Sequence, residues 1–336
     1  MLQPRIIHAP GFAKGDWLNT ETPYTNHALR GQVVLVEFWD YTSFHCMRML
    51  PYLKGWHERY SDRGLTIVGV HSPEFSFAHS RHTVEEAVRA FDLPYPILLD
   101  NGLQTWQAFA NTVRPTRYLV DAAGYIRFQA YGADSTRQTE AALQMLLRER
   151  DPNVELPALM PAPDQQSCAQ PRLYAGYFQG ALGNREGYAA EGTLAYRLPI
   201  EWERTEASFY VDGFWRAEAE AMVFAGRELG RVMLPYTGQR VHAVLSPSND
   251  PVEVILGLRP TDQEPLIEVY QDGHPLTPLN AGADVHAGAE GSILAVNRAR
   301  AFELVNNPAV ETHELELCFR ASGLSLYSFT VSGCVA

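Results

Sequence analysis

Residues 33–50 read VVLVEFWDYTSFHCMRML and combine two different periodicities. Residues 33–38 are apolar except for Glu37 and rich in β-branched side chains, which predicts a strand buried on both faces of a sheet. A helix is predicted from residue 46 to residue 60, because apolar side chains recur there at helical spacing: Met47, Leu50, Leu53 and Trp56. The stretch therefore predicts a strand, a short loop and a helix.

The rest of the first half continues this alternation of strands and helices. Helices are predicted at 139–147 and at 83–91, the latter opened by Thr83 with acidic residues in its first turn. Strands alternating with helices of this size predict an α/β fold, in which helices cover both faces of a mixed sheet. Four further strands are predicted, at residues 65–70, 96–99, 117–120 and 125–129.

The pattern changes after residue 150. Five prolines fall between residues 150 and 172 without a sustained period, which predicts a semi-stiff linker. Beyond it, short strand signals alternate with turn signals such as Asp272-Gly273 and Asn306-Asn307-Pro308, which predicts an all-β sandwich. We therefore expect domains at 1–150 and 171–336, joined by a linker at 151–170. The predicted strands are 208–211, 243–245, 252–258, 267–270, 293–296, 313–319 and 326–331.

The composition limits the classes of function. The 336 residues carry 27 Lys and Arg against 39 Asp and Glu, a net charge of −12, which argues against a nucleic-acid partner because phosphate binding requires clustered cations. The sequence contains no run of about 20 apolar residues, so no membrane span is predicted. Residues 1–19 lack the apolar core of a secretory signal. The chain as written is expected to be soluble and cytoplasmic, or periplasmic if a leader was removed, so its localisation stays open.

Three features of the first half share the layout of a thioredoxin active site. Glu37 precedes Ser43 by six residues, and Pro51 follows Cys46 by five. Farther along, Arg114-Pro115-Thr116 leads into a predicted strand, at the place where thioredoxin-like folds carry a cis-proline facing the redox pair. The first half therefore resembles a thioredoxin-like domain, and this resemblance implies a cis bond before Pro115.

The resemblance extends along nearly the whole chain. LRGQVVLVEFWDYT at 29–42, GLTIVGVHSPEF at 64–75 and YLVDAAGYIR at 118–127 are similar to the redoxin domain of DipZ-type proteins. The second half, from LYAGY at 173–177 to LYSFT at 326–330, is similar to the carbohydrate-binding-module-like domain that follows it in those proteins. The resemblance implies a thioredoxin-like fold followed by a jelly-roll-like β-sandwich.

The chain departs from this family at the reactive pair. Cys-x-x-Cys is replaced by Ser43-Phe44-His45-Cys46, so a serine holds the position of the attacking thiol. Disulfide exchange needs a thiolate to form the mixed disulfide and a second thiol to resolve it, and a hydroxyl cannot supply the first. The resemblance implies a thiol-disulfide oxidoreductase for protein or peptide substrates, attenuated or inactive as written. A redox-inactive scaffold that binds peptide or carbohydrate is the alternative.

Several residues around the pair are candidates for its chemistry. His45 would lower the pKa of a neighbouring thiol, or serve only as a polar residue at the helix start. Glu37 is a candidate proton acceptor for Cys46, with a partly exposed acid at the strand end as the alternative. Pro115 is expected to present backbone to an extended peptide, with a tight turn as the alternative. Candidate substrate contacts flank the pair: Trp39, Phe44, Arg114 and Glu74.

Two other classes of site receive less support from the sequence. A peroxiredoxin-type peroxidase would carry a proline where this chain has Trp39. His79, Arg81 and His82 lie close together, but no cysteine or carboxylate pair completes a metal-binding set, so a solvated polar loop is expected there. No metal and no other cofactor is predicted.

The second half offers aromatic residues and cysteines as candidates. Aromatics at alternating strand positions are more often core than sugar-stacking residues, so a structural or interaction role is favoured over carbohydrate binding. Cys168 and Cys334 would form a disulfide if the first and last strands of the sandwich are neighbours, whereas four free thiols would exclude it. The aromatic candidates for carbohydrate contact are Trp202, Tyr210, Phe214, Trp215 and Tyr236.

Overall fold

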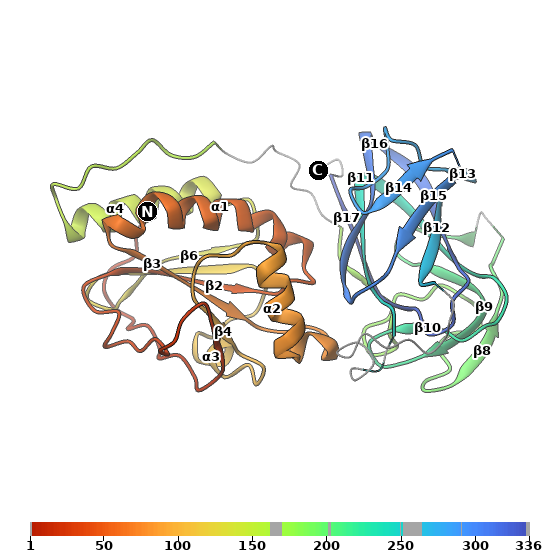
Figure 1. The fold of residues 1–336 in the computed structure, drawn as a ribbon, viewed down its shortest axis with the longest axis horizontal. Coiled ribbons are helices and arrows are strands. Elements are labelled where there is room, and N and C mark those ends of the chain that lie inside the picture. Colours follow the sequence, from red (N-terminus) through yellow and green to blue (C-terminus); the bar gives the residue numbers. More distant parts are fainter. Residues whose placement is uncertain are drawn as a thin grey trace. The chain divides into compact units, whose positions relative to one another are not determined.

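A computed structural model of the chain describes residues 2–161, 170–200, 203–248, 250, 264–289 and 291–333. The chain divides into two compact units, Met1–Gln165 and Gln166–Ala336, and Figure 1 shows the elements of each. The domain limits predicted at residues 150 and 171 stay a prediction. Several predicted features lie outside the described residues: the strand at 252–258, Trp202, and the disulfide between Cys168 and Cys334.

Six strands of the first unit form one mixed sheet in the order β1-β4-β3-β2-β5-β6. β2 lies inside this sheet, parallel to β3 and antiparallel to β5. Every β2 residue is buried, as its apolar run predicted. The strands are β1 (Trp17–Leu18), β2 (Val33–Trp39), β3 (Leu65–His71), β4 (Ile97–Leu99), β5 (Thr116–Val120) and β6 (Ile126–Tyr131).

Helices and irregular segments cover the two faces of this sheet. α1 and α4 lie side by side along one face (Figure 1). On the other face, Val34 and Val36 of β2 pack against Trp17, Leu29 and Phe109, which come from β1, a loop and the end of α3. The helices are α1 (Phe44–Tyr60), α2 (Arg81–Ala90), α3 (Gln104–Ala108) and α4 (Thr136–Arg150), with 3₁₀ turns η1 (Ser61–Arg63) and η2 (Ser76–His79). No helix in the described part of the chain is long and apolar enough to cross a membrane.

Helix α2 begins earlier than the sequence predicted. Ser80 is its N-cap residue, and Thr83 is buried within the first turn. The Thr83 hydroxyl donates to the Ser80 carbonyl at 2.9 Å, which places Thr83 within the first turn and not at the capping position. Arg81 and His82 therefore lie in a helix, and the loop predicted for them is wrong.

Residues 157–160 of the proline-rich segment after α4 pack on the first unit. Gln144 of α4 donates to the Pro157 carbonyl at 2.7 Å, and the Met160 N–H donates to Glu140 Oε2 at 2.8 Å. Glu140 is buried and also accepts the Tyr60 hydroxyl of α1 at 2.7 Å. This part of the predicted linker is therefore held against α1 and α4 by hydrogen bonds.

The second unit is an all-antiparallel β structure. Its principal path of hydrogen-bonded strands runs β14-β15-β12-β16-β11-β17-β10-β9-β8, with β13 beside β12 and β7 beside β17. All pairings between these strands are antiparallel, which confirms the all-β class. The strands are β7 (Leu173–Tyr174), β8 (Thr193–Tyr196), β9 (Tyr210–Ala217), β10 (Met222–Phe224), β11 (Gly230–Ser246), β12 (Leu266–Gln271), β13 (His274–Pro275), β14 (Val285–Gly288), β15 (Gly291–Ala295), β16 (Arg300–Phe319) and β17 (Ser325–Ser332).

Two of these strands are much longer than predicted. β11 has 17 residues and β16 has 20, and the predicted turn at Asn306-Asn307-Pro308 lies inside β16. The register explains why the turn signal is wrong. Gly238 pairs with Glu311 and Arg240 with Asn306, so one β11 residue lies opposite four residues of β16. This irregularity leaves Pro308 outside the regular ladder, where its missing N–H does not break the strand.

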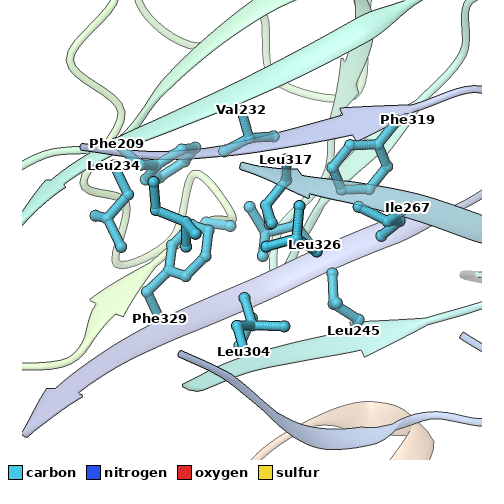
Figure 2. Close-up of a cluster of buried hydrophobic side chains, with 14 of the residues drawn as sticks. Phe209, Val232, Leu234, Leu245, Ile267, Leu304, Leu317, Phe319, Leu326 and Phe329 are labelled. Carbon is cyan, nitrogen blue, oxygen red and sulfur yellow. The ribbon is translucent and has the colours of Figure 1, made fainter. Parts of the chain in front are cut away.

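The long strands enclose one apolar core. β11 contributes to it from both of its halves, through Val232 and Leu234 at one end and Leu245 at the other (Figure 2). Because a single cluster receives side chains from both halves, the paired strands wrap around it as two layers would. The side chains labelled in Figure 2 are all 0% exposed: Phe209, Val232, Leu234, Leu245, Ile267, Leu304, Leu317, Phe319, Leu326 and Phe329.

Candidate active site

The segment between β2 and α1 brings Ser43 and Cys46 together. Ser43 is the N-cap residue of α1, with extended backbone (φ −96°, ψ 114°), and its carbonyl accepts the Met47 N–H at 3.0 Å. Its hydroxyl makes no capping bond and instead lies close enough to the Cys46 thiol to favour the thiolate form. The two end positions of Ser43-Phe44-His45-Cys46 are therefore in contact across the first turn of the helix.

Cys46 is a buried thiol of low reactivity. It is 1% exposed, and burial raises its pKa to about 12. Hydrogen bonds from the Ser43 hydroxyl and the Asp40 N–H favour the thiolate, while the negative charges of Glu37 and Asp40 disfavour it. Because the thiolate is the nucleophilic form, Cys46 alone is poorly suited to attack a disulfide or a peroxide.

Glu37 lies on β2 and interacts electrostatically with Cys46. Its side chain is fully buried, so the partly exposed strand-end acid considered as an alternative is wrong: the inner strand β2 is covered on both faces. Burial raises the pKa of Glu37 to about 8, although the charge of Arg117 opposes this shift. Neither carboxylate oxygen has a hydrogen-bond partner among the described residues. Glu37 is therefore an acid that can hold or release a proton near neutral pH.

Arg117 is a site residue that the sequence did not reveal. It is fully buried, its Nε lies 4.0 Å from Glu37 Oε2, and the two residues are direct partners in the register of β2 and β5. Its guanidinium also donates to Met49 Sδ at 2.6 Å, to Ser135 Oγ at 2.7 Å and to the Gly132 carbonyl. A charged residue within the apolar run 116–120 was the available signal, because a buried arginine requires a partner.

Pro115 lies at the same edge of the sheet as the Ser43 loop, which we define as residues 40–43. The Arg114–Pro115 bond is cis, as the resemblance implied. Thr116, the first residue of β5, pairs with Phe38 of β2, so Pro115 comes level with the end of β2 where the Ser43 loop leaves the sheet. The strand register therefore places the cis-proline beside the loop that carries Ser43.

The predicted substrate contacts differ in exposure. Trp39 is 2% exposed, with its ring centroid 5.4 Å from that of His71, and direct substrate contact by this residue stays a prediction. Phe44 is also buried, with its ring centroid 5.8 Å from that of the half-buried His45. The Arg114 guanidinium lies 4.4 Å from the Trp106 ring centroid. Direct substrate contacts by Phe44, Arg114 and Glu74 stay predictions.

The second unit does not assemble the predicted aromatic surface. Tyr210, Trp215 and Tyr236 are buried, so sugar stacking on these rings is wrong and their core role is confirmed. Phe214 is the exposed member of the described candidates, at 56%. Cys318 is a free, buried cysteine, and burial together with nearby carboxylates raises its pKa to about 12. Among the described residues, no group of three or more His, Cys, Asp or Glu could hold a metal ion.

These observations define the class of the protein. The first unit is a thioredoxin-like α/β structure in which a strand–loop–helix site and a cis-proline occupy one edge of the sheet. An all-antiparallel β unit follows it in the chain. Comparison with known protein families agrees with this division. Residues 8–129 match the AhpC/TSA family, and residues 171–331 match a family described as a thioredoxin-like C-terminal domain.

Individual relatives show the same similarity. Protein DipZ of Mycobacterium bovis is 30% identical over 288 residues, which are 83% of this chain and 38% of DipZ. The thiol-disulfide oxidoreductase ResA of Bacillus cereus is 25% identical over 118 residues, 35% of this chain and 65% of ResA. A solved thiol:disulfide interchange protein of the thioredoxin family from Chlorobium tepidum is 21% identical, with a TM-score of 0.37, and covers 43% of this chain and 99% of its own.

The DipZ proteins are longer than this chain. This chain spans 38% of the length of the DipZ proteins that it matches. The thioredoxin-like assignment of the first unit rests on its strand order and on the position of the site. The match in the second unit carries a thioredoxin-like description, so its likeness to a carbohydrate-binding module stays a prediction.

Proposed function

We propose that the first unit is a thiol-disulfide oxidoreductase of the thioredoxin superfamily whose activity is attenuated or absent in its present Ser43 form. The observation that carries this proposal is the contact between the Ser43 hydroxyl and the Cys46 thiol at the start of α1. A sulfur atom in place of that oxygen would put two thiols next to each other at a helix N-terminus, which is the arrangement that dithiol exchange requires.

The chemistry of the dithiol form follows from this arrangement. A thiolate at position 43 attacks one sulfur of a substrate disulfide, that S–S bond breaks, and a mixed disulfide forms while the substrate's second sulfur leaves as a thiolate. The Cys46 thiol then loses its proton and attacks the sulfur at position 43. This step releases the reduced substrate and leaves an enzyme disulfide. Ser43 cannot perform the first step because a hydroxyl does not form a disulfide.

Glu37 is the proposed proton acceptor for Cys46. It is buried on the strand that leads to the site, and its charge acts on the thiol. A carboxyl whose pKa lies at about 8 is ionised in about one molecule in ten at pH 7 and in half of the molecules at pH 8, and the ionised form can take up the proton that Cys46 loses. Arg117 opposes protonation of this carboxyl and is a positioning residue for it.

Reduction of insulin by dithiothreitol tests the proposal. We expect the Ser43 chain to add little to the uncatalysed rate and Ser43→Cys to accelerate insulin precipitation. The double variant with Ser43→Cys and Cys46→Ser is the matched control, because it has the attacking thiol but cannot resolve the mixed disulfide. Ser43→Cys without activity, in a chain that is folded, would remove the proposal.

A redox-inactive scaffold is the second candidate for the chain as it stands. The burial of Cys46 and its raised pKa favour this reading of the present sequence over a peroxidase, or over an enzyme that would use Cys46 as a single reactive thiol. A peptide would then dock at the edge formed by Pro115 and the Ser43 loop. Carbohydrate binding by the second unit has less support, because Phe214 is the exposed ring among its described aromatic candidates.

A further inference from the structure

Asp40 joins two loops of the first unit through one side chain. Its carboxylate is 0% exposed, and each oxygen accepts one backbone N–H: Oδ1 from Thr42 at 2.8 Å and Oδ2 from Glu74 at 2.7 Å. Thr42 belongs to the Ser43 loop, whereas Glu74 belongs to the segment that follows β3, residues 72–75, which we call the β3 loop. The carboxylate therefore bridges the Ser43 loop and the β3 loop.

The main chain of Asp40 contacts the reactive pair itself. Its carbonyl accepts the Ser43 N–H at 3.1 Å, and its backbone N–H favours the thiolate form of Cys46. The Ser43 carbonyl in turn accepts the N–H of Met47 in the first turn of α1. A displacement of Asp40 would therefore disturb the start of the helix and uncover the thiol at the same time.

Two basic side chains interact with the buried carboxylate of Asp40. His71 is also 0% exposed, and its Nε2 lies 3.8 Å from Asp40 Oδ1. Arg114 acts on Asp40 electrostatically, and its Nε donates to the Ser72 carbonyl of the β3 loop at 2.7 Å. The residue before the cis-proline is thus tied to the same loop that Asp40 holds. Two loops are therefore bonded to this carboxylate, and Arg114 acts on it through its charge.

We propose that Asp40 is a positioning residue of this site, which holds the Ser43 loop closed over Cys46 and sets the accessibility of the thiol. Its carboxylate acts through the backbone of Thr42 and Glu74. A carboxylate suits this position because both of its oxygens are acceptors and both face N–H donors. The inference rests on the proposed function in taking Ser43 and Cys46 as the site, but the accessibility of Cys46 is measured without any redox activity.

Asp40→Asn tests this role in the full chain. The amide keeps the shape of the carboxylate but has one acceptor oxygen, so one of the two N–H groups would face an NH₂ donor. Asp121→Asn is the matched control. Asp121 is 3% exposed, and its Oδ1 accepts the N–H groups of Ala123 and Tyr125 at 3.0 Å each, after the end of β5 that lies away from Pro115.

The readout is the rate of alkylation by iodoacetamide at pH 8, assigned to Cys46 by peptide mass spectrometry. We expect Asp40→Asn to raise this rate about tenfold or more, because losing one bond to a buried charged group weakens the closed loop, and Asp121→Asn to change it less than about twofold. Equal rates in all three chains, or the same increase in both variants, would overturn the proposal.

Amide hydrogen exchange in the unaltered chain supplies a second test that no folding defect can obscure. If Asp40 holds the two loops closed as one unit, the loops open together and expose the N–H groups of Thr42, Ser43 and Glu74 to exchange at the same time. Their protection factors should then agree within about threefold. Protection factors that differ by about a hundredfold between Thr42 and Glu74 would show that the loops open independently and would contradict the role assigned to Asp40.

Discussion

Glu37→Gln should change the pH dependence of stability of the first unit. Burial raises the pKa of Glu37 from its ordinary value of 4.5 to about 8. The folded chain therefore keeps the Glu37 proton up to about pH 8, whereas the unfolded chain releases it near pH 4.5. The contribution of Glu37 to stability is highest below pH 4.5 and falls as the pH rises towards 8, because the buried carboxyl resists ionisation. Glutamine has nearly the same shape and does not titrate, so this decline should disappear in the variant.

The size of the effect follows from the two pKa values. A difference between 4.5 and about 8 corresponds to about 5 kcal/mol when the titration is complete. Between pH 5 and pH 9, the contribution of Glu37 to the free energy of unfolding falls by about 4 kcal/mol. Relative to the unaltered chain, Glu37→Gln should therefore gain about 4 kcal/mol of unfolding free energy over this pH interval.

Urea unfolding at pH 5 and pH 9, followed by the methyl resonances of Leu35 and Val68, measures this difference within the first unit alone. Glu140→Gln is the matched control, because Glu140 is also buried but accepts hydrogen bonds from Tyr60 and Met160. It should lower stability at both pH values by about 1–3 kcal/mol. The reasoning about Glu37 would be refuted if its replacement changed stability by the same amount at pH 5 and at pH 9.

Three further outcomes are expected. Arg117→Met should move the carboxyl titration of Glu37 above pH 8, seen in its side-chain carbon resonance, because the opposing positive charge is lost; an unchanged midpoint would show that the two side chains are uncoupled. Trp215→Ala should destabilise the second unit by about 3–5 kcal/mol in urea unfolding, because the ring is fully buried. Phe214→Ala, at an exposed position on the same strand, should change its stability by less than about 0.5 kcal/mol, and similar losses at the two positions would contradict the described core.

The local elements of the first unit could be predicted from the sequence. The apolar run of β2 and the helical period of α1 lie within short windows, and each forms where its own residues favour it. Arg117 could not be assigned in this way. Its pairing with Glu37 depends on β2 and β5 being neighbours in a specific register, which no local pattern contains.

Two other features were missed for similar reasons. Aspartate is a residue type that is common in loops. The burial of Asp40 depends on contacts with His71 and Glu74, which lie more than 30 positions away in the sequence. β16 was divided by the turn signal at Pro308, because the irregular pairing with β11 that accommodates this proline is visible only when both strands are placed. Sequence patterns therefore located the site, while long-range pairing determined its electrostatics.

The account depends most directly on whether positions 43 and 46 can share a disulfide. The measurement is mass spectrometry of the Ser43→Cys chain after equilibration with oxidised and reduced glutathione, followed by alkylation of the remaining thiols. The account predicts a peptide that joins the two positions through an intramolecular disulfide, and a glutathione adduct alone when Cys46→Ser is added. Separate alkylation of both positions, with no bond between them under oxidising conditions, would contradict it.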